Sequence, residues 1–259
     1  MRRAYIDVPE GQMHYRHAGS GSPVVLLHMS GSSSQEYEQI GEMLSARFSV
    51  YAPDILAFGS SDAPPRHYSL SEHARVIKSF MDALNIDKAY IAGNMVGSNI
   101  AAHFALQFPD RVISLFLGQY CYDPDFARFR SRREDPVFLP IHPAADGSHL
   151  KEIWKRADRY PVAPEIIDAR ALCLHQAGAL GESLHHALFE DEDFLQILPF
   201  ITVPTVVVAY GAFAECDMET YVAELIPGAI LETLEGATPY VTRSDPKAWG
   251  ELFLKHNNK

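Results

Sequence analysis

Two hydrophobic periodicities divide the chain into expected strands and helices. A continuous apolar run, typical of a strand covered on both faces, occupies residues 23–29, and further strands are expected at 48–55, 88–93 and 112–118. Between them, residues 69–86 carry apolar side chains at helical spacing, with Ser71 as the expected helix start. Strands that alternate with helices predict a parallel sheet with helices on both of its faces.

The two ends of the chain complete this sheet. Residues 4–8 and 12–18 predict a hairpin that turns at Pro9, Glu10 and Gly11. The last expected elements are strands at 205–211 and 229–236 and a helix at 246–256. Together these patterns predict one mostly parallel sheet of eight strands.

The segment between the sixth and seventh expected strands has a different pattern. Residues 123–199 are punctuated by proline and carry mostly helical patterns without a convincing strand. The chain therefore divides into an α/β core, residues 1–122 and 200–259, and a helical lid, residues 123–199.

Composition and charge limit the kinds of binding partner and the cellular compartment that we expect. The formal charge of −11 argues against a general surface for nucleic acid or anionic membranes, and no apolar run approaches the roughly 20 residues of a membrane span. Three widely spaced cysteines form neither a disulfide framework nor a metal motif. We expect a cytoplasmic protein with no metal or cofactor, whose partner is a small molecule; a homodimer stays open.

The stretch "YIAGNMVGSNIAAHFALQFPDRV", residues 90–112, carries the most informative motif. A short apolar strand reaches a turn between Gly93 and Gly97, and an alanine-rich helix follows. This is the layout of a nucleophile elbow, which thrusts its central residue into a cleft. Here the central residue is Met95.

Four motifs in order resemble the α/β-hydrolase family over nearly the whole chain. Beside the elbow, they are "VVLLHMSGSS" for a strand and its oxyanion loop, "APDILAFGSSD" after the next strand, and "LEGATPYVTRSDPKAW" near the C-terminus. Each motif is weak alone, but the order and spacing are specific. The resemblance implies the α/β-hydrolase fold, with helices on both faces of the sheet and a lid over its core.

The resemblance also shows where the usual catalytic triad would lie. Met95 occupies the nucleophile position, Pro239 the histidine position and Ala214 the position of the acid. A thioether has no proton to lose, and such hydrolases need a nucleophile, a histidine and a carboxylate. We therefore expect a degenerate triad and not an ordinary serine hydrolase.

The backbone of the elbow is expected to survive this loss. An oxyanion hole needs only backbone N–H groups, here those of Val96 and of a residue near Met29. We expect Met95 to keep the strained elbow geometry, at a cost on the order of 1–3 kcal/mol. Ordinary helical or extended geometry at Met95 would contradict this expectation.

Two histidines are candidate acids or bases. His28 precedes the oxyanion loop and either braces loops or acts as a base. His149 follows Asp146 and Ser148, two possible caps of a lid helix, and is either structural or a general acid or base from the lid. The other candidate ligand-binding residues are Met29, Asn94, Met95, Val96, Tyr120, Cys121 and Pro239. For Asn94 a turn-stabilising role, and for Cys121 a buried thiol, are the alternatives.

Three functions remain open. We favour a cofactor-independent enzyme that uses the oxyanion hole for non-hydrolytic chemistry of the lyase, isomerase, decarboxylase or cyclase type on a small apolar organic ligand. The alternative is a non-catalytic protein that binds such a molecule. The third is a hydrolase with a displaced nucleophile or an activated water.

Overall fold

The computed structural model describes residues 1–120, 125–135, 138–158, 160–212 and 218–257. Its centre is an eight-stranded sheet with the strand order β1-β2-β4-β3-β5-β6-β7-β8. The strands are β1 Arg2–Val8, β2 Gly11–Ala18, β3 Ser22–Leu27, β4 Phe48–Pro53, β5 Ala89–Asn94, β6 Val112–Gly118, β7 Thr205–Tyr210 and β8 Ile230–Leu234. β2 is antiparallel to both β1 and β4, and all other neighbours are parallel, as the apolar runs predicted.

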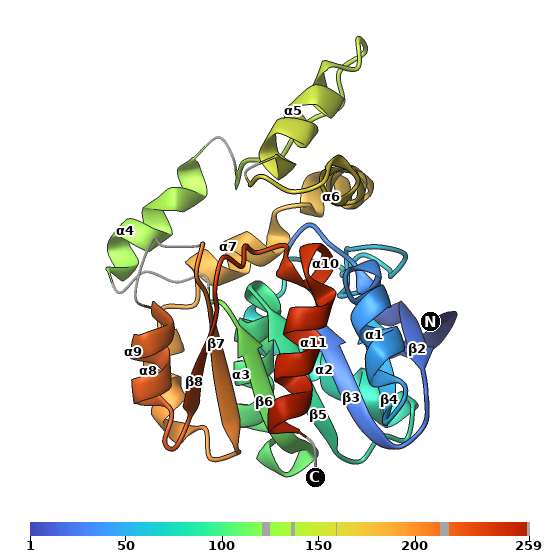
Figure 1. The fold of residues 1–259 in the computed structure, drawn as a ribbon. Helices are drawn as coiled ribbons and strands as arrows, with labels where there is room; N and C mark the ends of the chain where they lie inside the picture. The colour runs from blue at the N-terminus through green and yellow to red at the C-terminus, as the bar shows by residue number, and fades with distance from the viewer. Residues whose placement is uncertain (121–124, 136–137, 159, 213–217, 258–259) are drawn as a thin grey trace.

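Helices cover both faces of this sheet (Figure 1). The helices are α1 Glu38–Leu44, α2 Leu70–Ala83, α3 Val96–Gln107, α4 Phe126–Ser131, α5 Ser148–Ala157, α6 Pro164–Ala177, α7 Ser183–Phe189, α8 Phe194–Ile197, α9 Met218–Leu225, α10 Val241–Ser244 and α11 Pro246–His256. α1 and α11 lie on one face, and α2 and α3 lie on the other (Figure 1). The amphipathic pattern of 69–86 and the apolar pattern of 246–256 correspond to α2 and α11.

Each face buries its own hydrophobic cluster. Phe80 of α2 and Phe104 of α3 belong to the larger cluster, together with Leu117 of β6. On the opposite face, Trp249 of α11 meets Phe116 of β6 with ring centroids 4.8 Å apart. Because neighbouring β6 residues point to opposite faces, one apolar run supplies both clusters.

The start of α2 differs from the prediction. Ser69, not Ser71, is the N-cap: its hydroxyl accepts from the N–H of Glu72, and the Glu72 carboxylate accepts from the N–H of Ser69. This reciprocal pair is a full capping box and satisfies two amides that the helix leaves unbonded. The helix thus begins at Leu70, and Ser71 lies inside its first turn.

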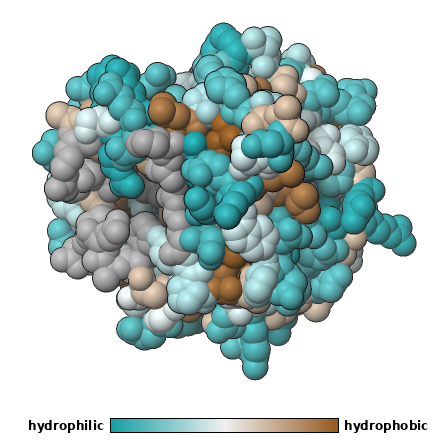
Figure 2. All heavy atoms as spheres, turned by 90° about the horizontal axis from the view of Figure 1, so that it is seen from above, coloured by the Kyte–Doolittle hydropathy of each residue, from teal (hydrophilic) through white to brown (hydrophobic). Residues whose placement is uncertain are grey.

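Helices α4 to α8 follow β6 and precede β7. α5 and α6 stand above the sheet, away from the layered core (Figure 1). In contrast, Leu184 and Leu188 of α7 and Phe194 of α8 pack in the same cluster as α2 and α3. We call α5, α6 and the loop before α5 the cap. Seen from the cap side, the surface is mostly hydrophilic, with hydrophobic residues in separate small areas (Figure 2).

Candidate active site

The elbow has the strained geometry expected of it. Met95 joins β5 to α3 with φ 55° and ψ −122°, and its N–H donates to the carbonyl of Gly118 at 2.8 Å. A Cβ atom on Gly93 would lie 2.3 Å from the backbone of Gly97, and one on Gly97 would lie 2.1 Å from the carbonyl oxygen of Leu27. Only glycine permits these approaches, so the prediction that the turn is kept is confirmed.

Met95 forms part of a small apolar cluster between the sheet and the cap. It shares this cluster with Met29 from the loop after β3 and with Tyr240 from the late loop. The cap contributes the remaining buried members, Ala157, Ile166 and Ile167, with Trp154, Tyr160, Val162 and Ala171 packed against them. The side chain at the elbow therefore faces an apolar environment that the cap encloses.

Asn94, the residue before Met95, is fully buried and committed to the fold. Its amide nitrogen donates to Glu36 at 2.7 Å and to the carbonyl of Pro239 at 3.0 Å. Its carbonyl oxygen accepts from the Tyr210 hydroxyl at 2.8 Å. Because both N–H groups and the oxygen are used internally, the side chain holds the elbow and offers no amide hydrogen to a ligand.

Glu36 changes the expected oxyanion hole. This buried carboxylate accepts from the N–H of Met29 at 3.1 Å, in addition to Asn94 and the Thr242 hydroxyl. The Met29 amide is therefore occupied. The next amide, that of Ser30, has no hydrogen bond to any other described residue. Val96 begins α3, and the first N–H groups of a helix have no partner inside it, so Val96 and Ser30 carry the available donors.

Asp54 fixes the segment that follows the oxyanion loop. This buried carboxylate accepts from the N–H of Ser34 at 2.6 Å, from that of Ser60 at 2.8 Å, and from His14 Nδ1 at 2.7 Å. Burial raises the pKa of Asp54, but these hydrogen bonds outweigh it and hold the pKa below its usual value. The ionised carboxylate thereby connects β2 and β4 to the loop.

His28 lies fully buried under the same loop. Its Nε2 accepts from the N–H of Ile55 at 2.9 Å, which leaves Nδ1 as the protonated nitrogen that donates to the carbonyl of Met29 at 2.8 Å. Each ring nitrogen is therefore hydrogen-bonded to the backbone of a different loop. In this geometry His28 braces the loops and has no free lone pair for a base.

Pro239 lies beside the elbow, where its carbonyl meets Asn94, and Tyr240 joins the late loop to the cap. The Tyr240 hydroxyl donates to the carbonyl of Ala157 at 2.5 Å and accepts from Arg170 at 2.7 Å. Arg170, on α6, also stacks over the Tyr240 ring at 5.7 Å. Its Nε–H is buried without a partner, and no carboxylate of the described residues forms an ion pair with it.

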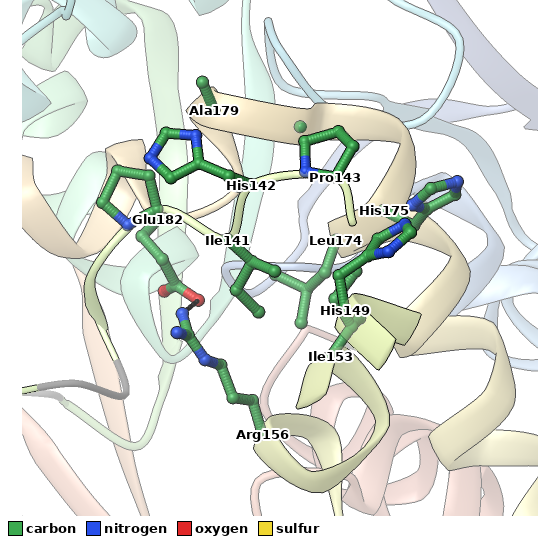
Figure 3. A pocket seen from close by; sticks show the side chains of 13 residues that line it. Ile141, His142, Pro143, His149, Ile153, Arg156, Leu174, His175, Ala179 and Glu182 are labelled. Atoms are coloured by element: carbon green, nitrogen blue, oxygen red, sulfur yellow. Dashed lines mark ion pairs between the residues drawn. The ribbon is translucent and has the colours of Figure 1, made fainter. Parts of the chain in front are cut away.

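His149 lies in the cap and not at the elbow. Its Nδ1 accepts from the N–H of Ala144 at 3.1 Å, and its ring lies 5.8 Å from that of His175. Both rings line a pocket of about 180 Å³ within the cap, floored by apolar side chains such as Leu174 (Figure 3). Glu182 and Arg156 form an ion pair across this pocket at 4.0 Å (Figure 3). Ser148 does not cap α5; Gly147 occupies that position.

The histidine that meets the oxyanion loop is His185 of α7. Its Nδ1 lies 2.6 Å from Glu182 Oε2 and 3.3 Å from Ser30 Oγ. Burial raises the pKa of Glu182, but the hydrogen bond from His185 and the charges of His185, Arg170 and Arg156 hold it below its usual value. Sequence reasoning missed this pair, although the Glu-x-x-His spacing on a helix was available as a signal.

The remaining candidates lie elsewhere. Tyr120 packs in the larger core cluster, with its ring 5.4 Å from that of Phe194, and burial raises its pKa well above the usual value. Its side chain faces the core. Cys121 and Ala214 lie outside the described residues.

The described residues contain no group of three or more His, Cys, Asp or Glu side chains placed to hold a metal ion. None of their helices is both long and apolar enough to cross a membrane.

Comparison with known proteins shows what part of the chain resembles. Residues 22–120 match the family described as alpha/beta hydrolase fold. The chain is 36% identical over 121 residues to haloalkane dehalogenase 2 of Mycobacterium tuberculosis, covering 46% of this chain and 42% of that protein. It is 37% identical over 111 residues to 2-hydroxy-6-oxo-6-phenylhexa-2,4-dienoate hydrolase of Burkholderia cepacia, covering 41% and 39%. The matches thus span less than half the length of these curated relatives.

The solved structures extend the likeness to the whole chain. A thermophilic esterase from Thermogutta terrifontis superposes with a TM-score of 0.80 at 20% identity, covering 100% of this chain and 98% of the esterase. At this identity the likeness shows the fold. The protein therefore has the α/β-hydrolase fold, with an eight-stranded, mostly parallel mixed sheet. The curated relatives, which match at modest identity and over less than half of their length, are named as hydrolases.

Proposed function

We propose that this protein is a cofactor-independent enzyme that binds a small organic acid between Met95 and the cap and transforms it without an acyl-enzyme. The reaction class is lyase, isomerase, decarboxylase or cyclase. The observation that carries the proposal is the guanidinium of Arg170, which the cap holds beside Tyr240 without a carboxylate partner.

The environment of Arg170 favours an anionic ligand. A partly buried cation is costly unless an anion pairs with it, and Glu182 acts on Arg170 only through a longer-range attraction. The unpartnered Nε–H is a donor suited to a carboxylate, because a guanidinium binds carboxylates in a fixed, often two-pronged geometry. A carboxylate at this point would supply the missing charge.

The apolar cluster around Met95 suits the apolar body of such an acid. Met29, Ile166 and Ile167 pack in one apolar cluster with Met95, which holds the nucleophile position. Methionine adapts its shape to an irregular ligand. The Burkholderia cepacia relative is named for a dienoate substrate, which also combines an apolar body with a carboxylate.

The expected loss of the triad supports a reaction without an acyl-enzyme. Met95 supplies no nucleophile and Pro239 supplies no imidazole, while the acid position falls on Ala214. The amides of Val96 and Ser30 remain as donors for an enolate, because such donors stabilise developing charge without a nucleophile. Met29, whose amide is bound to Glu36, drops out of this role.

Two alternatives each have support. A non-catalytic binder would agree with the internal use of Asn94 and with the apolar surroundings of Met95. A hydrolase with an activated water would agree with the hydrolase names of the relatives. A panel of short and medium acyl esters tests for hydrolase activity. Turnover by the native protein that is lost in Met95→Ala or His149→Ala would support hydrolysis.

Ligand binding tests the central proposal. We expect aromatic and branched short-chain carboxylic acids to raise the melting temperature, while the corresponding primary amides do not. The Arg170→Met variant should bind the same acids at least tenfold more weakly, as expected for one lost charge-assisted contact of about 1.4 kcal/mol or more. Isothermal titration of each acid–amide pair gives both affinities.

The matched control is Arg133→Met, which removes an exposed arginine between α4 and the cap. Its affinities should equal those of the native protein. Equal binding of acid and amide, or native affinity in Arg170→Met, would contradict a carboxylate site at Arg170.

A further inference from the structure

We propose that His185, oriented by Glu182, is the general base of this enzyme. The proton-transfer group then lies on α7 and not at Pro239, the expected histidine position. This inference rests on the proposed function and names its catalytic residue. His185 lies 3.3 Å from Ser30 Oγ, and Ser30 follows Met29, whose side chain packs with Met95. The imidazole thus contacts the oxyanion loop at the residue next to Met29.

The hydrogen bonds fix which nitrogen is free. Glu182 is ionised and lies 2.6 Å from Nδ1, so Nδ1 carries the proton and donates it to the carboxylate. Ser30 Oγ, at 3.3 Å from the same nitrogen, accepts a second and weaker hydrogen bond from this N–H. Nε2 has no partner among the described residues, and the His185 side chain keeps 15% of its surface exposed. Nε2 therefore carries the lone pair that can accept a proton.

This arrangement argues against Ser30 as a substitute nucleophile. A histidine that activates a serine must accept the serine proton. Here Ser30 meets Nδ1, which the adjacent carboxylate keeps protonated. Ser30 instead helps to orient the ring, together with Phe138, whose ring centroid lies 4.9 Å from that of His185.

The charged groups around the pair stabilise it. Glu182 faces Arg156 of α5 at 4.0 Å and is attracted by Arg170 of α6. Two cations, Arg156 and Arg170, therefore balance the carboxylate together with His185. When His185 takes up a proton, the buried Glu182 lies in direct contact with the new positive charge, which is how a carboxylate stabilises an imidazolium.

The step is a proton transfer from carbon. Nε2 of His185 takes a proton from the carbon next to the substrate carbonyl, and the C–H bond breaks. Its electron pair forms the C–C double bond of an enolate, whose negative oxygen lies toward the amides of Val96 and Ser30. The imidazolium then returns its proton to the same or a neighbouring carbon. Nothing is oxidised, and no co-reactant is consumed.

Deuterium exchange tests this step with defined probes. Proton NMR in D₂O follows loss of the C3 hydrogens of 2-oxobutanoate and phenylpyruvate. We expect the native protein to accelerate exchange at least 100-fold over buffer, in the range of general-base catalysis, and His185→Gln to remove that acceleration. Glu182→Gln should lower the rate at saturating probe by tenfold or more with little change in KM, because Arg170 sets the affinity.

The matched control is His186→Gln, the next residue on α7, whose Nε2 contacts the carbonyl of Phe138. It should exchange at the native rate. Native exchange by His185→Gln would overturn the assignment. So would the absence of exchange by a native protein that binds the probes through Arg170; that result would leave the carboxylate site in place. Loss of binding selectivity for acids would instead overturn the proposed function.

Discussion

At the scale of single residues, Glu36 decides how the site is built. One buried carboxylate accepts hydrogen bonds from Met29, Asn94 and Thr242, which lie in three separate segments of the chain. It thereby fixes the oxyanion loop, the elbow and α10 relative to one another. No local sequence pattern predicts this role, because a glutamate in "SSSQEYEQ" looks like an ordinary polar residue before a helix.

Replacing Glu36 by glutamine should lower the free energy of unfolding by about 2–4 kcal/mol. The NH₂ group of the glutamine would face N–H and O–H donors that now donate to a carboxylate oxygen, so at least one donor would lose its acceptor. Leaving a buried donor unpaired costs more than losing a neutral hydrogen bond. Urea unfolding measures the change. Glu38→Gln is the control: Glu38 pairs with Arg16 at 2.9 Å but is 39% exposed, so its loss should cost less than 1 kcal/mol. Equal effects of the two substitutions would show that the buried network contributes no special stability.

At the scale of elements, the sequence predicts strands and helices where local pattern and final environment agree. Strand β6 matches its apolar run of 112–118, and α11 matches the segment 246–256. α1 was not predicted, because its seven residues are too short to show a period. The start of α2 was misplaced by two residues, since Ser69 and Ser71 are both plausible caps and only the Glu72 contact distinguishes them.

The capping box of α2 gives a direct test at this scale. Ser69→Ala should destabilise the protein by about 1 kcal/mol, because it leaves the Glu72 amide without its acceptor. Ser71→Ala should change stability by less than 0.5 kcal/mol, since alanine is the better helix former inside the first turn. Thermal and urea unfolding measure both variants. A larger loss for Ser71→Ala would place the cap where the sequence pattern first suggested it.

At the scale of the whole molecule, the fold could be predicted and the site only in part. The core follows from four motifs in order, and the elbow geometry at Met95 follows from Gly93 and Gly97. The sequence suggested His149 and not His185, because which histidine reaches the oxyanion loop depends on how α5 and α7 pack. α7 joins the core cluster and brings His185 to Ser30, while α5 carries His149 into the cap pocket.

The response of the whole molecule to acid should depend on His73. This α2 side chain is 2% exposed, its Nδ1 has no hydrogen-bond partner among the described residues, and its ring packs against Tyr68. Burial lowers its pKa from 6.5 to about 4; the charge of Glu72 raises it slightly, and His28 opposes protonation. Between these two values the unfolded chain binds a proton that the folded protein does not. Stability is therefore unaffected above pH 6.5 and falls as the pH drops from 6.5 to 4.

Comparison of unfolding curves across this range isolates the contribution of His73. Leucine cannot titrate, so the stability of His73→Leu relative to the native protein should increase by about 2–4 kcal/mol as the pH falls from 7 to 4. His67→Leu, at an exposed position, should keep a constant difference from the native protein. Parallel curves for native and His73→Leu would mean that His73 is protonated in the folded state without penalty. The acid sensitivity would then have to come from the buried carboxylates, Asp54 first among them, whose lowered pKa also makes the folded state lose stability in acid.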